Sequence, residues 1–163
     1  MVKMIAMKIS VTQSGIALYK NGKLKEVSVI KGKGKDKMYS MVKELNFTLS
    51  SIKPDVIVIE LPSLTRKTET QKKQTMMIYG SIYSWAVVHG CDFIEICSTD
   101  WKMWCCKGTD IDNSRKEKNL SAMNVAKKIY PKLTFETEEV AESALIGLAH
   151  INRINAKIKG LPK

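Results

Sequence analysis

The sequence predicts an α/β layered domain in which a five-stranded mixed sheet is flanked by helices. Near the start, short strand-like runs follow one another with turns between them, which indicates antiparallel strands. Later strand-like runs alternate with runs of helical periodicity, which is typical of parallel crossovers. The 163 residues, 44% of them apolar, leave room for one globular domain with a sizeable core. We therefore expect a single domain over residues 1–163.

The first part of the chain predicts three consecutive antiparallel strands. Residues 4–10 and 15–19 are apolar runs on either side of a polar turn. Asn21-Gly22 is a strong hairpin signal, and it leads into a third run over residues 24–30. The charged, glycine-broken segment over residues 31–37 connects these strands to the rest of the chain.

The remainder of the chain alternates helices and strands. Apolar residues at helical spacing predict an amphipathic helix over residues 37–52, ended before Pro54. The continuous apolar run over residues 55–60 predicts a central strand covered on both faces. After a polar, basic segment we expect a long helix over about residues 75–89 and a fifth strand over residues 92–96. Three further helices are expected: a short one with a loop within residues 98–108, a basic one over 114–130, and a last one over about 138–157.

The charge balance favours a polyanionic partner. The chain has 27 Lys and Arg against 16 Asp and Glu, a formal net charge of +11. Neutralising phosphates with such charge releases counterions and gives affinity for nucleic acid without reading its sequence. No apolar run approaches the roughly 18 residues of a membrane span, and the N-terminus has no apolar stretch typical of a signal peptide. We therefore expect a cytoplasmic protein with no membrane partner.

Three glutamates stand in positions that suggest a shared site. Glu60 ends the strand over residues 55–60, and a buried carboxylate is costly unless it is paired or bound to a cation. Glu139 and Glu142 are three positions apart, so they share a helix face and their carboxylates can converge. A salt bridge at Glu60, and a favourable helix-dipole interaction of the helix glutamates, are the alternative explanations. Carboxylates of this kind are ligands for Mg²⁺, and two such ions can activate a water and stabilise the leaving oxygen of a phosphodiester.

The order of these motifs resembles that of the RuvC-like Holliday-junction resolvases of the RNase H-like superfamily, especially their small phage and poxvirus branch. The family's first strand ends in an aspartate followed by a Ser/Gly turn and a "tGiA" strand, and this chain reads "MKISVTQSGIA". "VIVIE", which ends in Glu60, matches the family's "vviE" strand. Glu139-Val140-Ala141-Glu142-Ser143 matches the acid-x-Ala-acid-Ser/Ala opening of the family's last helix. The similarity spans roughly residues 4–150.

The resemblance implies an RNase H-like three-layer fold and a two-metal endonuclease that cleaves four-way junctions and other branched DNA in recombination and repair. It implies that Glu60, Glu139 and Glu142 are catalytic metal ligands for Mg²⁺ or Mn²⁺, with no small-molecule cofactor, and that the protein of a phage would work in the host cytoplasm. The family also has a basic residue near the scissile phosphate, for which Lys118 is the nearest match. A homodimer is implied, with the helix over residues 75–89 at its interface. The apolar residues of that helix could equally be intramolecular core: Met76, Met77, Ile78, Ile82, Trp85 and Val88.

Lys8 stands where the family has its fourth acidic residue. An ammonium in place of a carboxylate changes the local charge by two units and opposes a divalent cation. Lys8 could instead pair with Glu60 or with a helix glutamate. We therefore expect a chain that folds and binds branched DNA but cleaves it poorly or not at all, whether the lysine is natural or was introduced to inactivate a nuclease.

Basic residues near these motifs are candidates for contacts with DNA phosphates. They follow Glu60 in a loop, flank Trp101 and Trp104, or open the basic helix: Arg66, Lys67, Lys72, Lys73, Lys102, Lys107, Arg115, Lys116 and Lys118. Packing is the favoured role for the two tryptophans, and stacking on an unpaired base is the alternative. Two other functions stay open: a non-catalytic DNA-binding or architectural protein, and an RNase H-like nuclease that acts on another nucleic acid.

Overall fold

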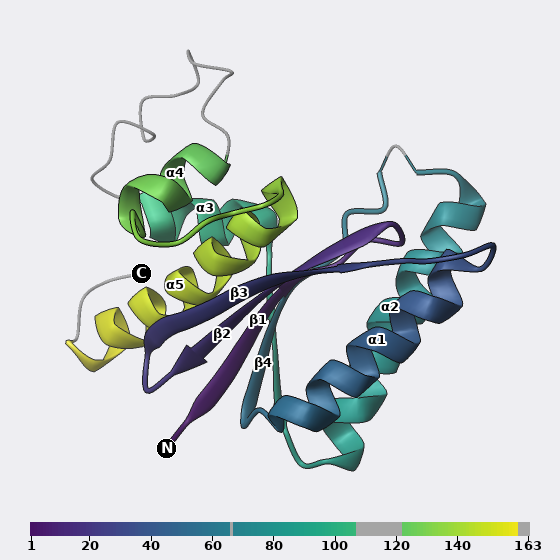
Figure 1. Cartoon of the computed structure of the whole chain (residues 1–163). Helices are drawn as coiled ribbons and strands as arrows, with labels where there is room; N and C mark the ends of the chain where they lie inside the picture. The colour runs from purple at the N-terminus through teal and green to yellow at the C-terminus, as the bar shows by residue number, and fades with distance from the viewer. Residues whose placement is uncertain (66, 107–121, 160–163) are drawn as a thin grey trace.

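The computed structural model describes residues 1–65, 67–106 and 122–159 (Figure 1). Five strands form one sheet in the order β3-β2-β1-β4-β5. The strands β1 and β2 are antiparallel, as are β2 and β3, whereas β4 runs parallel to β1 and β5 parallel to β4. The predicted mixed sheet is confirmed, with these bounds: β1 Lys3–Lys8, β2 Gln13–Lys20, β3 Lys23–Lys31, β4 Val56–Glu60 and β5 Asp92–Ile96.

Helices cover both faces of this sheet and make three layers (Figure 1). On one face lie α1 (Lys37–Ile52) and α2 (Glu69–Val88), and on the other lie α3 (Ser98–Cys106), α4 (Ala122–Ile129) and α5 (Glu138–Ile158). Alternate residues of β1 enter different cores: Ile5 packs in the cluster of α1 and α2, and Ala6 in that of α5. This explains the continuous apolar character of the central strands, because both of their faces are covered. None of the helices in the described ranges is long and apolar enough to cross a membrane.

The helix α2 begins at Glu69, earlier than predicted. The hydroxyl of Thr68 accepts a hydrogen bond from the backbone N–H of Gln71, and the side chain of Gln71 accepts one from the backbone N–H of Thr68. This capping box starts the helix within the polar, basic segment. The prediction that Lys72 and Lys73 lie in the loop after Glu60 was therefore wrong, because both lie on α2.

The other predicted helices agree more closely with the structure. The helix α1 has the predicted bounds, and α5 starts at the predicted Glu138 and ends one residue later than expected, at Ile158. The basic helix predicted over residues 114–130 is described only as Ala122–Ile129, and residues 114–121 lie outside the described ranges.

Glycine allows the start of α5 to lie directly on the sheet. A Cβ atom at Gly15 of β2 would overlap the backbone carbonyl of Glu139. Further along the helix, a Cβ at Gly147 would overlap the ring of Tyr19. These close approaches bring the first turns of α5, with Glu139 and Glu142, to the end of the sheet at which the strands β1 and β4 finish.

Candidate active site

Lys8 and Glu60 meet at the carboxyl ends of two adjacent parallel strands. Met7 of β1 lies opposite Ile59 of β4, so the next residue of each strand lies at the same end of the sheet. The Nζ atom of Lys8 lies 2.6 Å from Oε1 of Glu60. Glu60 is only 4% exposed, so the ammonium supplies the partner that a buried carboxylate needs.

The helix α5 brings a second carboxylate to the same ammonium. Oε2 of Glu142 lies 3.5 Å from Nζ of Lys8. Burial raises the pKa of Glu142, the charge of Lys8 acts against this rise, and the nearby Glu60 carboxylate adds to it. Lys8 therefore bridges two carboxylates that would otherwise repel each other.

Trp101 completes the contacts of Glu60. Its side chain is 2% exposed, and its Nε1 donates a hydrogen bond of 2.8 Å to Oε2 of Glu60. Both oxygens of this carboxylate thus have a partner, one charged and one neutral. The sequence reasoning expected Trp101 to pack and missed this bond. The available signal was that α3 starts directly after β5, the neighbour of β4, so its first turn lies near the end of β4.

Glu139 is held by a different partner. Its Oε2 accepts a hydrogen bond of 2.8 Å from Nε2 of Gln13, at the start of β2. Sequence reasoning also missed Gln13, which lies in a polar turn among several other hydrogen-bonding side chains. The structure therefore gathers Glu60 and Glu142 around Lys8, and ties Glu139 to β2.

The residues present do not fit a divalent cation as they stand. A cation bound between Glu60 and Glu142 would have to share that space with the ammonium of Lys8, which lies within 2.6 Å of one carboxylate and 3.5 Å of the other. Among the described residues, no group of three or more His, Cys, Asp or Glu side chains could hold a metal ion. That Glu60, Glu139 and Glu142 are metal ligands, with metal binding weakened by Lys8, stays a prediction.

Two of the predicted DNA-contacting lysines lie beside this site. Lys67 lines a cleft of about 200 Å³ together with Lys8 and Glu60, and its Nζ donates a 3.1 Å hydrogen bond to Oγ1 of Thr75. Burial, and then the charge of Lys8, lowers the pKa of Lys67. Lys102 lies with its Nζ 5.3 Å from the centre of the Trp101 ring.

The other predicted contacts lie on α2 or outside the described ranges. The Nζ atom of Lys72 is 2.6 Å from a carboxylate oxygen of Glu69, an ion pair on α2. Lys72 and Lys73 both line a surface groove of that helix. Five of the predicted residues lie outside the described ranges: Arg66, Lys107, Arg115, Lys116 and Lys118.

The chain has the fold of RuvC-like Holliday-junction resolvases. It superposes on RuvC of Thermus thermophilus, solved with a Holliday-junction substrate, with a TM-score of 0.71 and 13% identity over 95% of this chain and 96% of that one. For the yeast mitochondrial Holliday-junction resolvase the TM-score is 0.67, with 13% identity over 98% of this chain and 81% of that one. For the fowlpox virus resolvase, solved with Holliday-junction DNA, it is 0.54, with 16% identity over 94% and 99%. A scan of family models and a search of curated proteins each found no match to the sequence.

Proposed function

We propose that this chain binds four-way junctions and other branched DNA, and that Lys8 makes it a poor nuclease or an inactive one. The observation that carries this proposal is the ammonium of Lys8 between Glu60 and Glu142, 2.6 Å from one carboxylate and 3.5 Å from the other. The site lies at the end of the parallel strands, where α/β sheets bind their ligands. The shared fold with proteins solved on Holliday junctions supports DNA as the partner.

The charge of Lys8 explains why cleavage would fail while binding persists. At an effective dielectric constant near 20, two unit charges about 4 Å apart interact by roughly 4 kcal/mol. Replacing an acid by a lysine therefore turns a favourable interaction with Mg²⁺ or Mn²⁺ into an unfavourable one of similar size. A DNA phosphate, in contrast, is attracted by an added cation. With an aspartate at position 8, Glu60, Glu139 and Glu142 would be the remaining metal ligands, as the resemblance implies.

Lysines around the site support contact with the DNA backbone. Lys67 lines the cleft beside Lys8, and the charge of Lys102 is close enough to lower the pKa of Glu142, against the larger opposite effect of burial. Lys72 and Lys73 extend the basic surface along α2. The same role is proposed for the residues outside the described ranges, with Lys118 nearest the scissile phosphate: Arg66, Lys107, Arg115, Lys116 and Lys118.

An exposed apolar surface on α2 supports a homodimer. Ile78, Ile82 and Trp85 of this helix are buried in the core. Five other large apolar side chains of α2 are 42 to 78% exposed, and we call them the α2 apolar surface: Met76, Met77, Tyr83, Val87 and Val88. Several exposed large apolar side chains on one helix are unusual for a surface that only meets water, and apolar surface of this kind often marks interaction sites. We propose that it packs against the same surface of a second copy.

Binding of labelled DNA by fluorescence anisotropy tests this function. We expect the parent protein to bind a four-way junction more tightly than a linear duplex of the same sequence, and to do so in EDTA without any need for Mg²⁺. Lys67→Ala should weaken binding. It should also reduce the slope of log affinity against log salt concentration by about one, because each phosphate contact releases about one counterion. Lys43→Ala, an exposed lysine on α1, is the matched control. Equal affinity for duplex and junction would support the architectural alternative and contradict the proposal.

A further inference from the structure

A lysine-rich loop connects the end of β3 to the start of α1. Lys33, Lys35 and Lys37 lie on this connection or at its end, and all three are exposed. We call these three lysines the basic loop. With the one acid between them, Asp36, they give residues 33–37 a net charge of +2. None of the three is among the residues predicted from the sequence to contact DNA.

The loop is held against the turn between β1 and β2, and it closes on itself. The backbone N–H of Gly32 donates a 2.9 Å hydrogen bond to the carbonyl of Thr12. A Cβ atom at Gly32 would lie only 2.8 Å from the carbonyl oxygen of Lys37, so the two ends of the loop are in close contact. The backbone N–H of Lys33 donates a 2.7 Å hydrogen bond to the hydroxyl of Ser40 on α1. The basic loop is therefore ordered before a partner binds, which reduces the entropy cost of binding.

The charges of the basic loop have no ion-pair partner in the part of the chain that the structure describes. The ion pairs found there belong to Lys8 and to Lys72, which lie on other elements. The carboxylate of Asp36 accepts a 2.9 Å hydrogen bond from the backbone N–H of Tyr39 and caps the start of α1. Three ammonium groups on one short loop are thus available to an anionic partner.

The basic loop lies at the same end of the sheet as the candidate active site (Figure 1). Lys31, the last residue of β3, lies opposite Gln13 of β2, and Gly15 of β2 lies opposite Lys8 of β1. The strands β3 and β1 are two places apart in the sheet, which is about 10 Å at ~4.8 Å between neighbouring strands. Lys31 does not belong to the basic loop, because it shares a sheet face with Gln13, which bonds the carboxylate of Glu139.

We propose that the basic loop binds backbone phosphates of a duplex arm of branched DNA that leads into the candidate active site. This inference rests on the proposed function and adds a second contact surface to it. Each strand of B-DNA has one phosphate per ~3.4 Å of helix axis, so about 10 Å corresponds to about three base pairs. A duplex with one phosphate beside Lys8 and Lys67 would therefore place another near the basic loop. Residues 32–37 have charge but no apolar side chain to bury, which suits a phosphate backbone better than a protein partner.

The salt dependence of junction binding tests this proposal. A triple variant with Lys33→Ala, Lys35→Ala and Lys37→Ala should bind a labelled four-way junction at least about tenfold more weakly than the parent protein at ~0.15 M salt. The slope of log affinity against log salt concentration should fall by about one for each lysine that contacts a phosphate, and so by about two to three in all. Because the three side chains are exposed, the variant should unfold at the same temperature as the parent protein.

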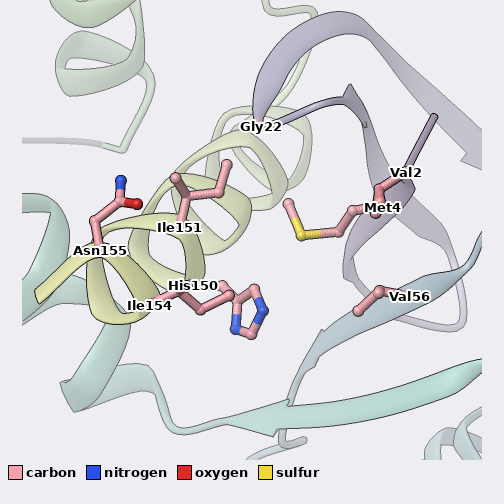
Figure 2. Close-up of a pocket in the computed structure, with 8 residues that line it drawn as sticks. All are labelled: Val2, Met4, Gly22, Val56, His150, Ile151, Ile154 and Asn155. Carbon is pink, nitrogen blue, oxygen red and sulfur yellow. The ribbon is translucent and has the colours of Figure 1, made fainter. Parts of the chain in front are cut away.

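The other end of the β2–β3 hairpin provides a matched control. Lys20, Lys23 and Lys25 lie at or near the turn that contains Gly22, and Gly22 lines a pocket with mostly apolar walls between the sheet and α5 (Figure 2). This pocket, of about 240 Å³, is at the end of the sheet opposite to the candidate active site. Replacing these three lysines by alanine removes the same charge. It should change junction affinity by less than about threefold, because salt screens charges that lie far from the DNA.

A neutral phosphate analogue locates the contact on the DNA. Single methylphosphonate groups at successive positions along one arm should weaken binding of the parent protein at two places about three base pairs apart. The triple variant should be insensitive at one of these places, and Lys67→Ala at the other.

Three results would overturn the proposal while leaving junction binding, and so the proposed function, intact. They are equal affinities of the triple variant and its control, an unchanged salt slope, and the same sensitivity to methylphosphonates in the triple variant as in the parent. A parent protein that binds no junction would contradict the proposed function as well.

Discussion

At the scale of single residues, Lys8 contributes the positive charge at the centre of the candidate site. Its ammonium lies between the carboxylates of Glu60 and Glu142, the position in which a cation would balance their repulsion. Trp101 donates a hydrogen bond to the other oxygen of Glu60, so both oxygens of this carboxylate have a partner within the protein. Lys8 thus balances the negative charges of Glu60 and Glu142 within the protein.

Trp101→Phe tests the neutral half of this arrangement. The substitution leaves Oε2 of Glu60 without its donor inside the protein, and an unsatisfied buried acceptor costs about 1–3 kcal/mol of unfolding free energy. Trp85→Phe is the matched control, because the indole of Trp85 bonds only the hydroxyl of Ser50, which is exposed and can bond water instead. Urea denaturation should show the larger loss for Trp101→Phe. Equal losses in the two variants would mean that the bond to Glu60 adds nothing.

Glu142→Gln tests the electrostatics through pH. Burial raises the pKa of Glu142 above its ordinary value of 4.5 in spite of Lys8, so the folded protein holds this proton more tightly than the unfolded chain does. The resulting stabilisation is present below pH 4.5 and is lost as pH rises through the raised folded value. The parent protein should therefore lose stability relative to Glu142→Gln as pH rises from about 4 to 7. Thermal unfolding of both proteins across this pH range measures the difference in stability. A parent protein whose stability rises relative to that of Glu142→Gln as pH rises would show that attraction to Lys8 dominates.

The sequence could locate some of these residues and not others. Lys8, Glu60 and Glu142 are recognisable because apolar patterns define where the strands end and where the last helix begins. Gln13 and Trp101 are not, because their bonds to Glu139 and Glu60 depend on how β2 and α3 lie against other elements. Periodicity gives the face of a helix or strand, but not the partner that a side chain meets across the fold.

At the scale of elements, the packing of α5 on β2 sets the site. The first turn of α5 contacts the sheet so closely that β2 has room only for glycine at position 15. The same contact places Gln13 within 2.8 Å of Glu139. The sequence predicted both elements but could not show this contact, since a glycine between two apolar strands is also typical of a turn.

Gly15→Ala tests the contact between these elements. The new Cβ would overlap backbone atoms of Glu139 and Val140, which cannot move without shifting the whole helix. We expect a loss of about 1–3 kcal/mol in unfolding free energy, the usual cost of overpacking. Ser28→Ala, at an exposed position of β3, is the control and should be nearly neutral. A Gly15→Ala protein as stable as this control would contradict the close approach.

The α2 apolar surface gives a second test at this scale. Met77→Glu places a charge on that surface and should weaken dimerisation at least about tenfold, because a buried interface does not tolerate an unpaired charge. Met103→Glu is the matched control: Met103 lies on α3, and both methionines are 54% exposed. Sedimentation equilibrium of the two variants and the parent measures the effect. A monomeric parent protein, or equal effects of the two substitutions, would contradict dimerisation through α2.

At the scale of the whole molecule, the order of elements and the net charge of +11 both favour the proposal that this protein binds nucleic acid. The mixed sheet, with antiparallel strands first and parallel strands after them, was predictable because each element has a clear apolar pattern, and the three layers were implied by the family resemblance. The start of α2 was not, because a capping box within a basic segment has the composition of a loop. The comparisons show the shared fold, and the proposed loss of cleavage depends on the one side chain at position 8.

Cleavage of a labelled four-way junction in Mg²⁺ by the parent protein and by Lys8→Asp tests the central claim most directly. We predict that Lys8→Asp cleaves at least about a hundredfold faster than the parent, since a correctly charged metal site is worth several kcal/mol in the transition state. The parent should cleave no faster than Lys8→Asp with Glu60→Gln added, which removes a predicted ligand. A folded, junction-binding Lys8→Asp protein that stays inactive, or a parent that cleaves as fast as Lys8→Asp, would contradict the account.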